Sequence, residues 1–346
     1  MSILITGATG FVGAFLVEKF IRQDKEVTLL IEKGFTKKVE DKKHIVGDIT
    51  KSHFNLHKNE FNDLKGKIKE VYHLAAAYKL DIDKKTAYEV NVDGTRNVLE
   101  FCKEAKNLEY LAYISTCMVS GKRCGVILES DFLNCGFNNC YEESKFEAEA
   151  LVREYIKEYR LPALIFRPGP IVGDSKTGAT EKFDGLYYVI EALSKTLFGR
   201  TMLLPLGNGK NYFQSVPVDF VVNAIYEISK SFKEMNREDF SKEYGNTFQL
   251  TDPNPLKVKE LIKEICKNLN VKEPLFCLPK WIAPIATTGL KLWNPFSIPK
   301  ETLPYFTADV FYDSKQTQKV LDSRIICPRA KDYLPEIINY WKSKKS

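Results

Sequence analysis

Short apolar runs alternate with longer segments of helical periodicity along the first half of the chain. The apolar runs cover residues 2–6, 26–31, 44–46, 70–74, 108–114 and 163–166. Apolar positions at helical spacing lie between them, up to residue 23 and over 86–106 and 139–160. Buried strands read as continuous apolar runs, and strands that alternate with helices form parallel sheets. The pattern predicts an α/β fold with a doubly wound parallel sheet and ligands at the carboxyl ends of its strands.

The regular alternation ends near Gly173. Beyond it, helical patterns cover 183–197, 220–230 and 258–269, a turn is expected at 174–178 and a loop at 203–209. Asp219 stands directly before one of these helices, so we expect its side chain to cap that helix. Residues 247–250 read as a strand that returns to the sheet.

A glycine-rich turn directly follows the first apolar run. Gly7, Gly10 and Gly13 lie between that strand and an amphipathic helix, and a second strand follows within about thirty residues, the spacing of a dinucleotide-binding unit. In such a unit Gly7 allows the tight turn, Gly10 lets a pyrophosphate approach the backbone, and Gly13 lets the helix pack on the strand. The free N–H groups of the helix then point at the phosphates.

The chain therefore divides into two expected domains. We expect residues 1–173, with 205–250 returning to them, to form a dinucleotide-binding Rossmann core. Residues 174–204 and 251–346 are expected to form a smaller, mostly C-terminal substrate-binding domain. An apolar region at 274–306, which contains Trp281, Trp293 and Phe296, is expected to line its pocket. The alternative is a patch in peripheral contact with a membrane, but its polar side is not strongly basic.

The end of the second strand gives a mixed indication of which dinucleotide binds. Glu32 could accept hydrogen bonds from the ribose hydroxyls of NAD. Lys33, Lys37 and Lys38 could instead neutralise the 2′-phosphate of NADP. A solvated charged loop explains the same lysines, so the residues alone leave this choice open.

Tyr141 and Lys145 are the candidate chemical pair. Four residues apart on a helix, they lie on one face within reach of each other. A neighbouring ammonium favours an ionised phenol and lowers its pKa from the ordinary value near 10. A tyrosine so tuned can transfer a proton near neutral pH. The spacing alone is more often a packed tyrosine under a lysine, so its meaning depends on its surroundings.

Composition excludes several other functions. The 346 residues are 44% hydrophobic and 28% charged, with a net charge of +6 and no basic tail, so nucleic-acid binding is not expected. The eight cysteines lack the spacing of zinc or redox motifs, and all four histidines lie at or before His73. We therefore expect reduced thiols, no metal site and a cytoplasmic location. No secretory signal or apolar run long enough to span a bilayer is found in the sequence.

Eight segments, taken in order, make the chain similar to the extended short-chain dehydrogenase/reductases. They are Thr6–Gly13, Gly47-Asp48, His73–Ala76, Asn91–Thr95, Ser115-Thr116, Tyr141–Lys145, Arg167–Gly169 and Pro217–Asp219. They cover residues 1 to about 225, and the resemblance is weaker beyond. It implies an NAD(P)-dependent oxidoreductase, which in this family often forms a homodimer through two helices of each protomer.

The resemblance also implies roles for individual residues. Tyr141 would be the general acid, Lys145 would lower its pKa and hold the nicotinamide ribose, and Thr116 would be the hydroxyl partner, with Ser115 as the alternative. Asp48 would bond the adenine. The residues expected to bind the cofactor are Gly7, Thr9, Gly10, Phe11, Val12, Gly13, Glu32, Lys33, Asp48, Ile49, Ala75, Ala76, Asn91, Tyr141, Lys145, Pro168 and Ile171.

Two segments resemble one branch of that family, the thioester reductases and fatty acyl-CoA reductases. These are Arg167–Gly178 and the Ser-Thr pair followed by Tyr141–Lys145. The resemblance implies hydride transfer from NADPH to an acyl thioester on CoA or a carrier protein, with release of thiol and formation of an aldehyde or alcohol. It favours NADP(H), whereas Glu32 departs from the arginine common in NADP-using members and keeps NAD(H) open.

Three alternatives remain at this point. The same residues would serve reduction or dehydrogenation of a ketone, sterol or aldehyde, and also an epimerase or dehydratase of a sugar nucleotide. The apolar region at 274–306 makes the sugar nucleotide less attractive. A dinucleotide-sensing protein without catalysis would not need the tyrosine–lysine pair.

Overall fold

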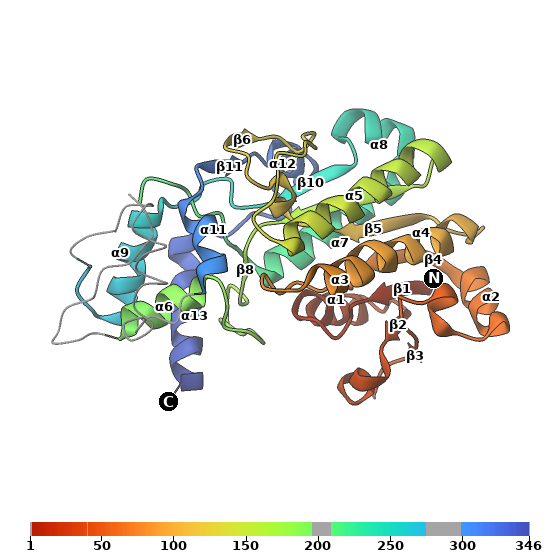
Figure 1. Cartoon of the computed structure of the whole chain (residues 1–346), viewed down its shortest axis with the longest axis horizontal. Coiled ribbons are helices and arrows are strands. Elements are labelled where there is room, and N and C mark those ends of the chain that lie inside the picture. The colour runs from red at the N-terminus through yellow and green to blue at the C-terminus, as the bar shows by residue number, and fades with distance from the viewer. Residues whose placement is uncertain (1, 40, 196–208, 275–298, 346) are drawn as a thin grey trace.

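The computed structural model describes residues 2–39, 41–195, 209–274 and 299–345, and its centre is a seven-stranded sheet (Figure 1). The strand order is β10-β7-β5-β4-β1-β2-β3, and every pair is parallel. The strands are β1 (Ser2–Thr6), β2 (Val27–Ile31), β3 (His44–Val46), β4 (Ile68–His73), β5 (Tyr110–Ile114), β7 (Ala163–Pro168) and β10 (Thr247–Leu250). The predicted α/β fold and the returning strand at 247–250 are confirmed.

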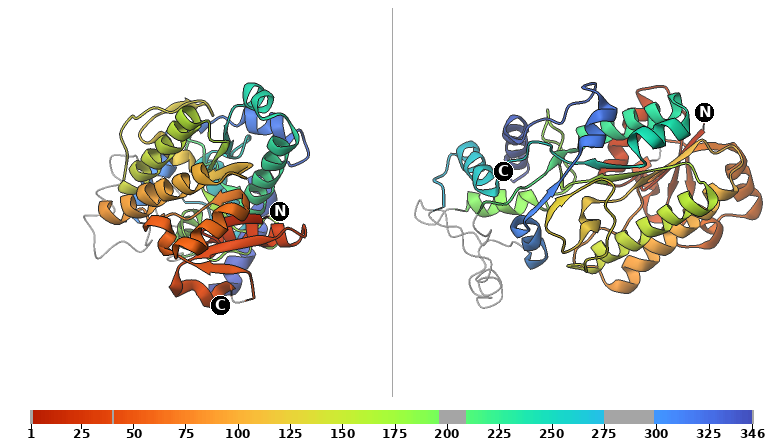
Figure 2. Two further views of the ribbon diagram at one scale, coloured as in Figure 1. Left: turned by 90° about the vertical axis from the view of Figure 1, so that its right-hand side faces the viewer. Right: turned by 90° about the horizontal axis from the view of Figure 1, so that it is seen from above.

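Helices cover both faces of this sheet (Figure 2). One face packs against α1 (Phe11–Ile21) and α7 (Val218–Glu234), whose apolar sides share a core with β1, β2 and β7. The other face packs against α2 (Lys58–Lys67), α4 (Gly94–Glu104) and α5 (Cys140–Tyr159). Because both faces are buried, the strands are apolar almost throughout, which is why their sequences read as continuous runs.

A second hydrophobic core lies beyond the carboxyl ends of the strands. It is built mainly from α6 (Leu186–Ser194), α9 (Val258–Leu269), α11 (Leu303–Thr307) and α13 (Ala330–Lys345), and we call it the C-terminal core. The helix expected at 183–197 begins at Leu186, directly after Gly185, whose φ of +56° is outside the helical region. Helix α13 has no counterpart among the sequence-based predictions.

Short elements connect the sheet to the C-terminal core. Two pairs of short parallel strands are β6 (Gly125–Ile127) with β11 (Val310–Tyr312), and β8 (Ile171–Val172) with β9 (Val216–Pro217). Among the described residues, the other helices are α3 (Lys84–Tyr88), α8 (Arg237–Tyr244) and α12 (Lys315–Leu321), with 3₁₀ turns η1 (Lys33–Val39), η2 (Ser52–Asn55), η4 (Cys117–Ser120) and η5 (Lys300–Thr302). Within the described ranges, no helix is both long and apolar enough to cross a bilayer.

Two expectations about helices need correction. The helix predicted over 86–106 is interrupted by a π-helical turn, η3 (Glu89–Asp93), between α3 and α4. The prediction that Asp219 caps α7 is wrong, because Pro217 is the N-cap residue and Asp219 lies in the first turn. Its carboxylate instead accepts hydrogen bonds from Ser175 N and Oγ, at 2.8 and 2.6 Å.

Some expectations fall outside the described residues. These are most of the loop at 203–209 and, within the apolar region at 274–306, the side chains of Trp281, Trp293 and Phe296. The division of the chain into a Rossmann core and a substrate-binding domain stays a prediction.

Candidate active site

The glycine turn lies at the carboxyl end of β1, where the strand order reverses between β1 and β4. Gly7 has a φ of +73°, and a Cβ there would lie 2.5 Å from the Ala75 nitrogen. A Cβ at Gly13 would lie 2.1 Å from the Gly7 carbonyl oxygen. Any side chain at Gly7 or Gly13 would therefore overlap the backbone. The close approach at Gly7 places the glycine turn beside the loop that follows β4.

The start of α1 fits a phosphate group. The N-cap residue is Gly10. Because glycine has no side chain, the cap residue leaves the N–H groups at the helix N-terminus open to a ligand. Thr9, Phe11 and Val12 are half-buried around it. Helix N-termini attract anions through their free N–H groups and dipole. The turn therefore has the geometry needed for the pyrophosphate of a dinucleotide.

The residues expected around the adenosine lie at the ends of β2 and β3. Glu32 and Lys33 are exposed where β2 runs into η1, the turn that also contains Lys37 and Lys38. Asp48 is half-buried, and its Oδ1 accepts hydrogen bonds from Thr50 N and Oγ1, both at 2.8 Å. Ile49 is buried. The structure thus brings an acid and a lysine to the edge where a ribose would lie.

A buried hydrogen-bond chain orders the loop after β4. His73 bonds Thr6 through Nδ1 at 2.7 Å and Thr95 through Nε2 at 3.0 Å. Ala75 N donates to the Thr6 hydroxyl at 3.3 Å. Burial, together with the charge of Lys145, lowers the pKa of His73 to about 3. His73 is therefore a neutral structural link that sets the position of Ala75.

Asn91 organises the same loop from the π-helical turn η3. It is 1% exposed, and its amide exchanges hydrogen bonds with the backbone of Ala77, at 2.8 Å to N and 3.0 Å to O. It also donates to the Ser144 hydroxyl at 2.9 Å. These bonds join the loop after β4 to α5, so the Asn91 side chain holds the loop beside the expected cofactor position. Its assignment as a cofactor ligand stays a prediction.

Tyr141, Lys145 and Thr116 converge where β5 ends beside the start of α5. The Thr116 hydroxyl forms a hydrogen bond with Tyr141. Lys145 is 3% exposed, donates to the Ile114 carbonyl at 2.8 Å, and lies 4.6 Å from the centre of the Tyr113 ring. The three residues expected to carry the chemistry are thus brought together.

The alternative hydroxyl, Ser115, points elsewhere. It is 4% exposed and donates to Glu149 Oε2 at 2.6 Å. The side chain bonded to Tyr141 is that of Thr116. Of the two hydroxyls, the geometry therefore favours Thr116 as the partner.

Burial governs the ionisation of this pair. It raises the pKa of Tyr141 above the usual value near 10, and the hydrogen bond with Thr116 opposes that rise. Burial lowers the pKa of Lys145 to about 7, and the charge of Glu149 opposes that fall. Displaced pKa values are typical of active sites. That Lys145 lowers the pKa of Tyr141 stays a prediction.

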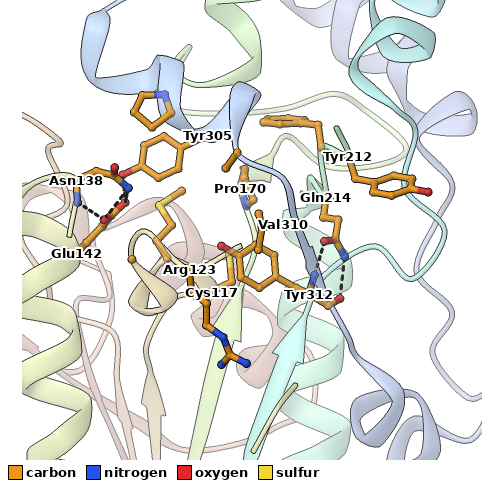
Figure 3. Close-up of a pocket in the computed structure, with 15 residues that line it drawn as sticks. Cys117, Arg123, Asn138, Glu142, Pro170, Tyr212, Gln214, Tyr305, Val310 and Tyr312 are labelled. Atoms are coloured by element: carbon orange, nitrogen blue, oxygen red, sulfur yellow. Dashed lines mark hydrogen bonds between the residues drawn. The ribbon is translucent and has the colours of Figure 1, made fainter. Parts of the chain in front are cut away.

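A pocket adjoins these residues on the side of the C-terminal core (Figure 3). Its wall includes Cys117 and Glu142, which directly follow Thr116 and Tyr141 in sequence. Glu142 and Asn138 lie beside Tyr305 at one side, and Gln214 bonds the backbone of Tyr312 at the other (Figure 3). Pro168 ends β7 and Ile171 lies in β8, so the strand leads into Pro170, another wall residue.

Sequence reasoning missed several residues of this site. Tyr305 and Tyr312 come from α11 and β11, far along the chain and outside any motif. Glu149 was also missed, although its spacing gives a signal. It follows Tyr141 by eight residues and Lys145 by four, so it lies on the same face of α5.

The chain is similar to NAD-binding proteins over most of its length. The family described as male sterility protein, an NAD-binding family, matches residues 5–225. The fatty acyl-CoA reductase wat of Drosophila melanogaster is 26% identical over 64% of this chain and 53% of that protein. A linear gramicidin synthase of Brevibacillus parabrevis is 22% identical over 98% of this chain but 7% of that protein. The chain thus spans less than two thirds of each of these relatives.

Solved structures share the fold. The terminal R domain from the myxalamid PKS-NRPS biosynthetic pathway superposes with a TM-score of 0.79 at 25% identity, covering 99% of this chain and 90% of that one. UDP-glucuronic acid 4-epimerase from Bacillus cereus, in complex with NAD, gives a TM-score of 0.70 at 18% identity with all of both chains covered. The epimerase shows a common fold alone, which many different activities use.

Proposed function

The chain belongs to the NAD-binding family described as male sterility protein, and from this premise we propose that it is an NAD(P)H-dependent reductase of acyl thioesters. The observation that carries the proposal is the meeting of Thr116, Tyr141 and Lys145 at the carboxyl ends of the parallel strands, beside the glycine turn. Similarity to a fatty acyl-CoA reductase and to a terminal R domain supports the thioester as substrate.

The residues suit protonation of a thioester carbonyl. The bound dinucleotide supplies a hydride to the carbonyl carbon. As negative charge grows on the carbonyl oxygen, the hydroxyls of Thr116 and Tyr141 donate hydrogen bonds to it, and Tyr141 transfers its proton. The resulting hemithioacetal then loses its thiol, and the carbonyl re-forms as an aldehyde. Because burial raises the pKa of Tyr141, the phenol holds its proton until that oxygen becomes basic.

We propose that the residues around the glycine turn bind the dinucleotide. Gly7, Gly10 and Gly13 would accept the pyrophosphate at the start of α1, and Lys145 would hold the nicotinamide ribose. We favour NADP(H), with Lys33 beside the 2′-phosphate. Glu32 is exposed at the same edge and opposes a phosphate there, so the protein should also use NADH.

Substrate binding is the role that we propose for the C-terminal part of the chain. We propose that residues 174–204 and 251–346 bind the acyl thioester, because Tyr305 and Tyr312 line the pocket beside Thr116 and Tyr141. We propose that the thioester is carried by CoA or by a carrier protein. Assembly as a homodimer is a further proposal that rests on the family resemblance.

The decisive experiment measures oxidation of NADPH and NADH with acyl-CoAs of increasing chain length while free thiol is trapped. We expect thiol to appear in step with dinucleotide consumption. Tyr141→Phe should lower kcat by at least about 100-fold, because the proton donor is lost. Tyr159→Phe is the matched control, since Tyr159 lies on the same helix but is 50% exposed at its far end.

Three outcomes would contradict parts of the proposal. Oxidation with ketones or aldehydes and no thiol release would point to a carbonyl reductase. Tight dinucleotide binding with no turnover of any carbonyl compound would instead indicate a sensor. Equal rates for the two tyrosine variants would remove Tyr141 from the mechanism.

A further inference from the structure

A buried network of charges lies directly behind the tyrosine–lysine pair. Glu149, on α5, is 0% exposed, and Arg167, on β7, is 1% exposed. Arg167 donates to both carboxylate oxygens of Glu149, at 2.6 and 3.0 Å, and to the Asp131 carbonyl at 2.9 Å. Arg153 adds a hydrogen bond to Glu149 at 2.9 Å. Buried ions are costly unless paired and fully hydrogen-bonded, and Glu149 meets that condition.

Glu149 also reaches forward to the segment after β5 that bears Thr116. Its Oε2 accepts the 2.6 Å hydrogen bond of Ser115. The backbone of Ser115 is fixed separately, since its N–H donates to the Phe166 carbonyl at 2.7 Å. Lys145 bonds the carbonyl of the preceding residue, Ile114, at 2.8 Å. The end of β5 is therefore held to α5 at two adjacent residues, through the Ile114 carbonyl and the Ser115 hydroxyl.

The groups that face Lys145 come from three elements. Glu149 faces it from α5, His73 from β4 and Tyr113 from β5. Burial lowers the pKa of His73 to about 3 and raises the pKa of Tyr113, so both are uncharged near neutral pH. Glu149 is thus the anion that these contacts place near Lys145.

We propose that Glu149 is a positioning residue: it holds Ser115 at the end of β5, so that Thr116 meets Tyr141, and its negative charge favours the ammonium form of Lys145. The proposal rests on the proposed function, because it assigns Glu149 a role behind the same three residues. Glu149 does not itself contact the reacting carbonyl in this scheme.

The sign of the electrostatic effect follows from the charges. An anion favours the charged form of a lysine, whereas burial disfavours it. Removing the Glu149 charge leaves burial unopposed and also leaves Arg167 and Arg153 without their counter-ion. Both changes disfavour the ammonium, so Glu149→Gln should lower the titration midpoint of Lys145 by about one pH unit or more.

The first test is a titration of the lysine itself. Protein labelled with ¹³C at lysine Cε is followed by NMR across pH 5 to 11, and the Lys145 resonance is assigned by its loss in Lys145→Met. Wild-type Lys145 should titrate near pH 7, apart from exposed lysines near 10.4. The midpoint should move down in Glu149→Gln. Glu154→Gln is the matched control, since Glu154 is exposed on the same helix and its loss should not move the midpoint.

A second variant guards against failure of Glu149→Gln to fold. Arg153 is 28% exposed at its side chain and pairs with Glu149, so Arg153→Gln should be tolerated better. It removes a cation that offsets the carboxylate, and the Lys145 midpoint should therefore rise. A midpoint that stays constant or falls in Arg153→Gln, or that stays constant or rises in Glu149→Gln, would overturn the electrostatic part of the proposal.

Kinetics test the positioning part. Ser115→Ala removes the 2.6 Å hydrogen bond without changing any charge, so kcat should fall about tenfold with KM nearly constant and an unmoved pH profile. In Glu149→Gln the alkaline limb of the kcat/KM profile, which reports the free enzyme, should move to lower pH together with the NMR midpoint. Glu149→Asp should restore the position of that limb. An unchanged kcat in Ser115→Ala would refute the role of the hydrogen bond.

The two proposals fail in distinguishable ways. If wild-type protein reduces no thioester, the proposed function fails, but the NMR titration still decides whether Glu149 controls the charge of Lys145. If thioesters are reduced but the titration midpoint of Lys145 is the same in wild type and Glu149→Gln, the proposed function is supported and the electrostatic role of Glu149 is refuted.

Discussion

Burial at the site favours the uncharged forms of two side chains, Lys145 and His73, more than water does. Burial lowers the pKa of Lys145 to about 7 and that of His73 to about 3. Both shifts cost stability at pH values where the group would be protonated in the unfolded chain. Such costs are retained where a function needs the group in place. The site is therefore expected to leave a signature in the pH dependence of folding.

His73 gives that signature in the acid range. Its pKa is lowered from 6.5 to about 3, so the stability it contributes is present above pH 6.5 and is lost as the pH falls. Between pH 6.5 and 5 the loss should be about 2 kcal/mol. Urea unfolding across this range should show a shallower dependence for His73→Gln, whereas His57→Gln, at an exposed position, should match wild type. Equal slopes for all three proteins would contradict this assignment.

At the scale of elements, the N-terminus of α5 links the tyrosine to the C-terminal core. Asn139 caps the helix by accepting from Glu142 N at 3.0 Å, and its Nδ2 donates to the Tyr305 hydroxyl at 2.8 Å. Tyr305 in turn donates to Glu142 Oε1 at 2.6 Å. Because Tyr141 lies between the two bonded residues, the cap fixes its position as well as the start of the helix.

Removal of this cap should affect both stability and rate. Asn139→Ala should cost about 1 kcal/mol of unfolding free energy and lower kcat, since Tyr305 loses a partner beside Tyr141. Asn236→Ala is the matched control, because Asn236 caps α8 in the same way, accepting from Glu238 and Asp239. It should cost similar stability and leave kcat unchanged. Urea unfolding measures the stability of both variants, and steady-state kinetics measure kcat. If kcat is the same for both variants, the hydrogen bond between Asn139 and Tyr305 does not affect catalysis.

The same elements show which features a sequence can reveal. The strands 2–6 and 44–46 were predicted to the residue. In β1 this follows from burial, because a buried parallel strand is apolar almost throughout, whereas β3 is a partly exposed edge strand. Tyr141 and Lys145 were visible because they lie four residues apart on one helix, α5. The π-helical turn was not, since it depends on the bonds of Asn91 to Ala77 and Ser144.

Long-range contacts explain the other failures. Asp219 looks like a helix cap in sequence, but its partner Ser175 lies 44 residues away. Tyr305 meets Glu142 across 163 residues. Neither periodicity nor a local motif records such contacts, and both belong to the region where the sheet meets the C-terminal core.

At the scale of the whole molecule, the C-terminal core contacts the sheet region through a close approach of two backbone segments. Gly178, in the turn after β8, has a φ of +69°, and a Cβ there would lie 2.1 Å from the Glu336 carbonyl oxygen of α13. The same turn is tied to α7 through Ser175 and Asp219. Gly178 thus lets α13, a helix of the C-terminal core, approach a segment anchored to the sheet.

Gly178→Ala should therefore separate cofactor binding from catalysis. A positive φ alone costs an alanine about 1 kcal/mol, and the clash with the α13 backbone should add at least about 2 kcal/mol. Gly125→Ala is the control for the first contribution, since its φ is +83° and a Cβ there meets nothing within 4 Å. Urea unfolding and thioester reduction should be impaired more in Gly178→Ala, while NADPH affinity changes little, because the atoms that a Cβ at Gly178 would meet belong to Glu336 and Tyr340 of α13 and not to the glycine turn. If both variants lose stability equally, α13 adjusts freely, and the two cores are joined less tightly than the contact at Gly178 indicates.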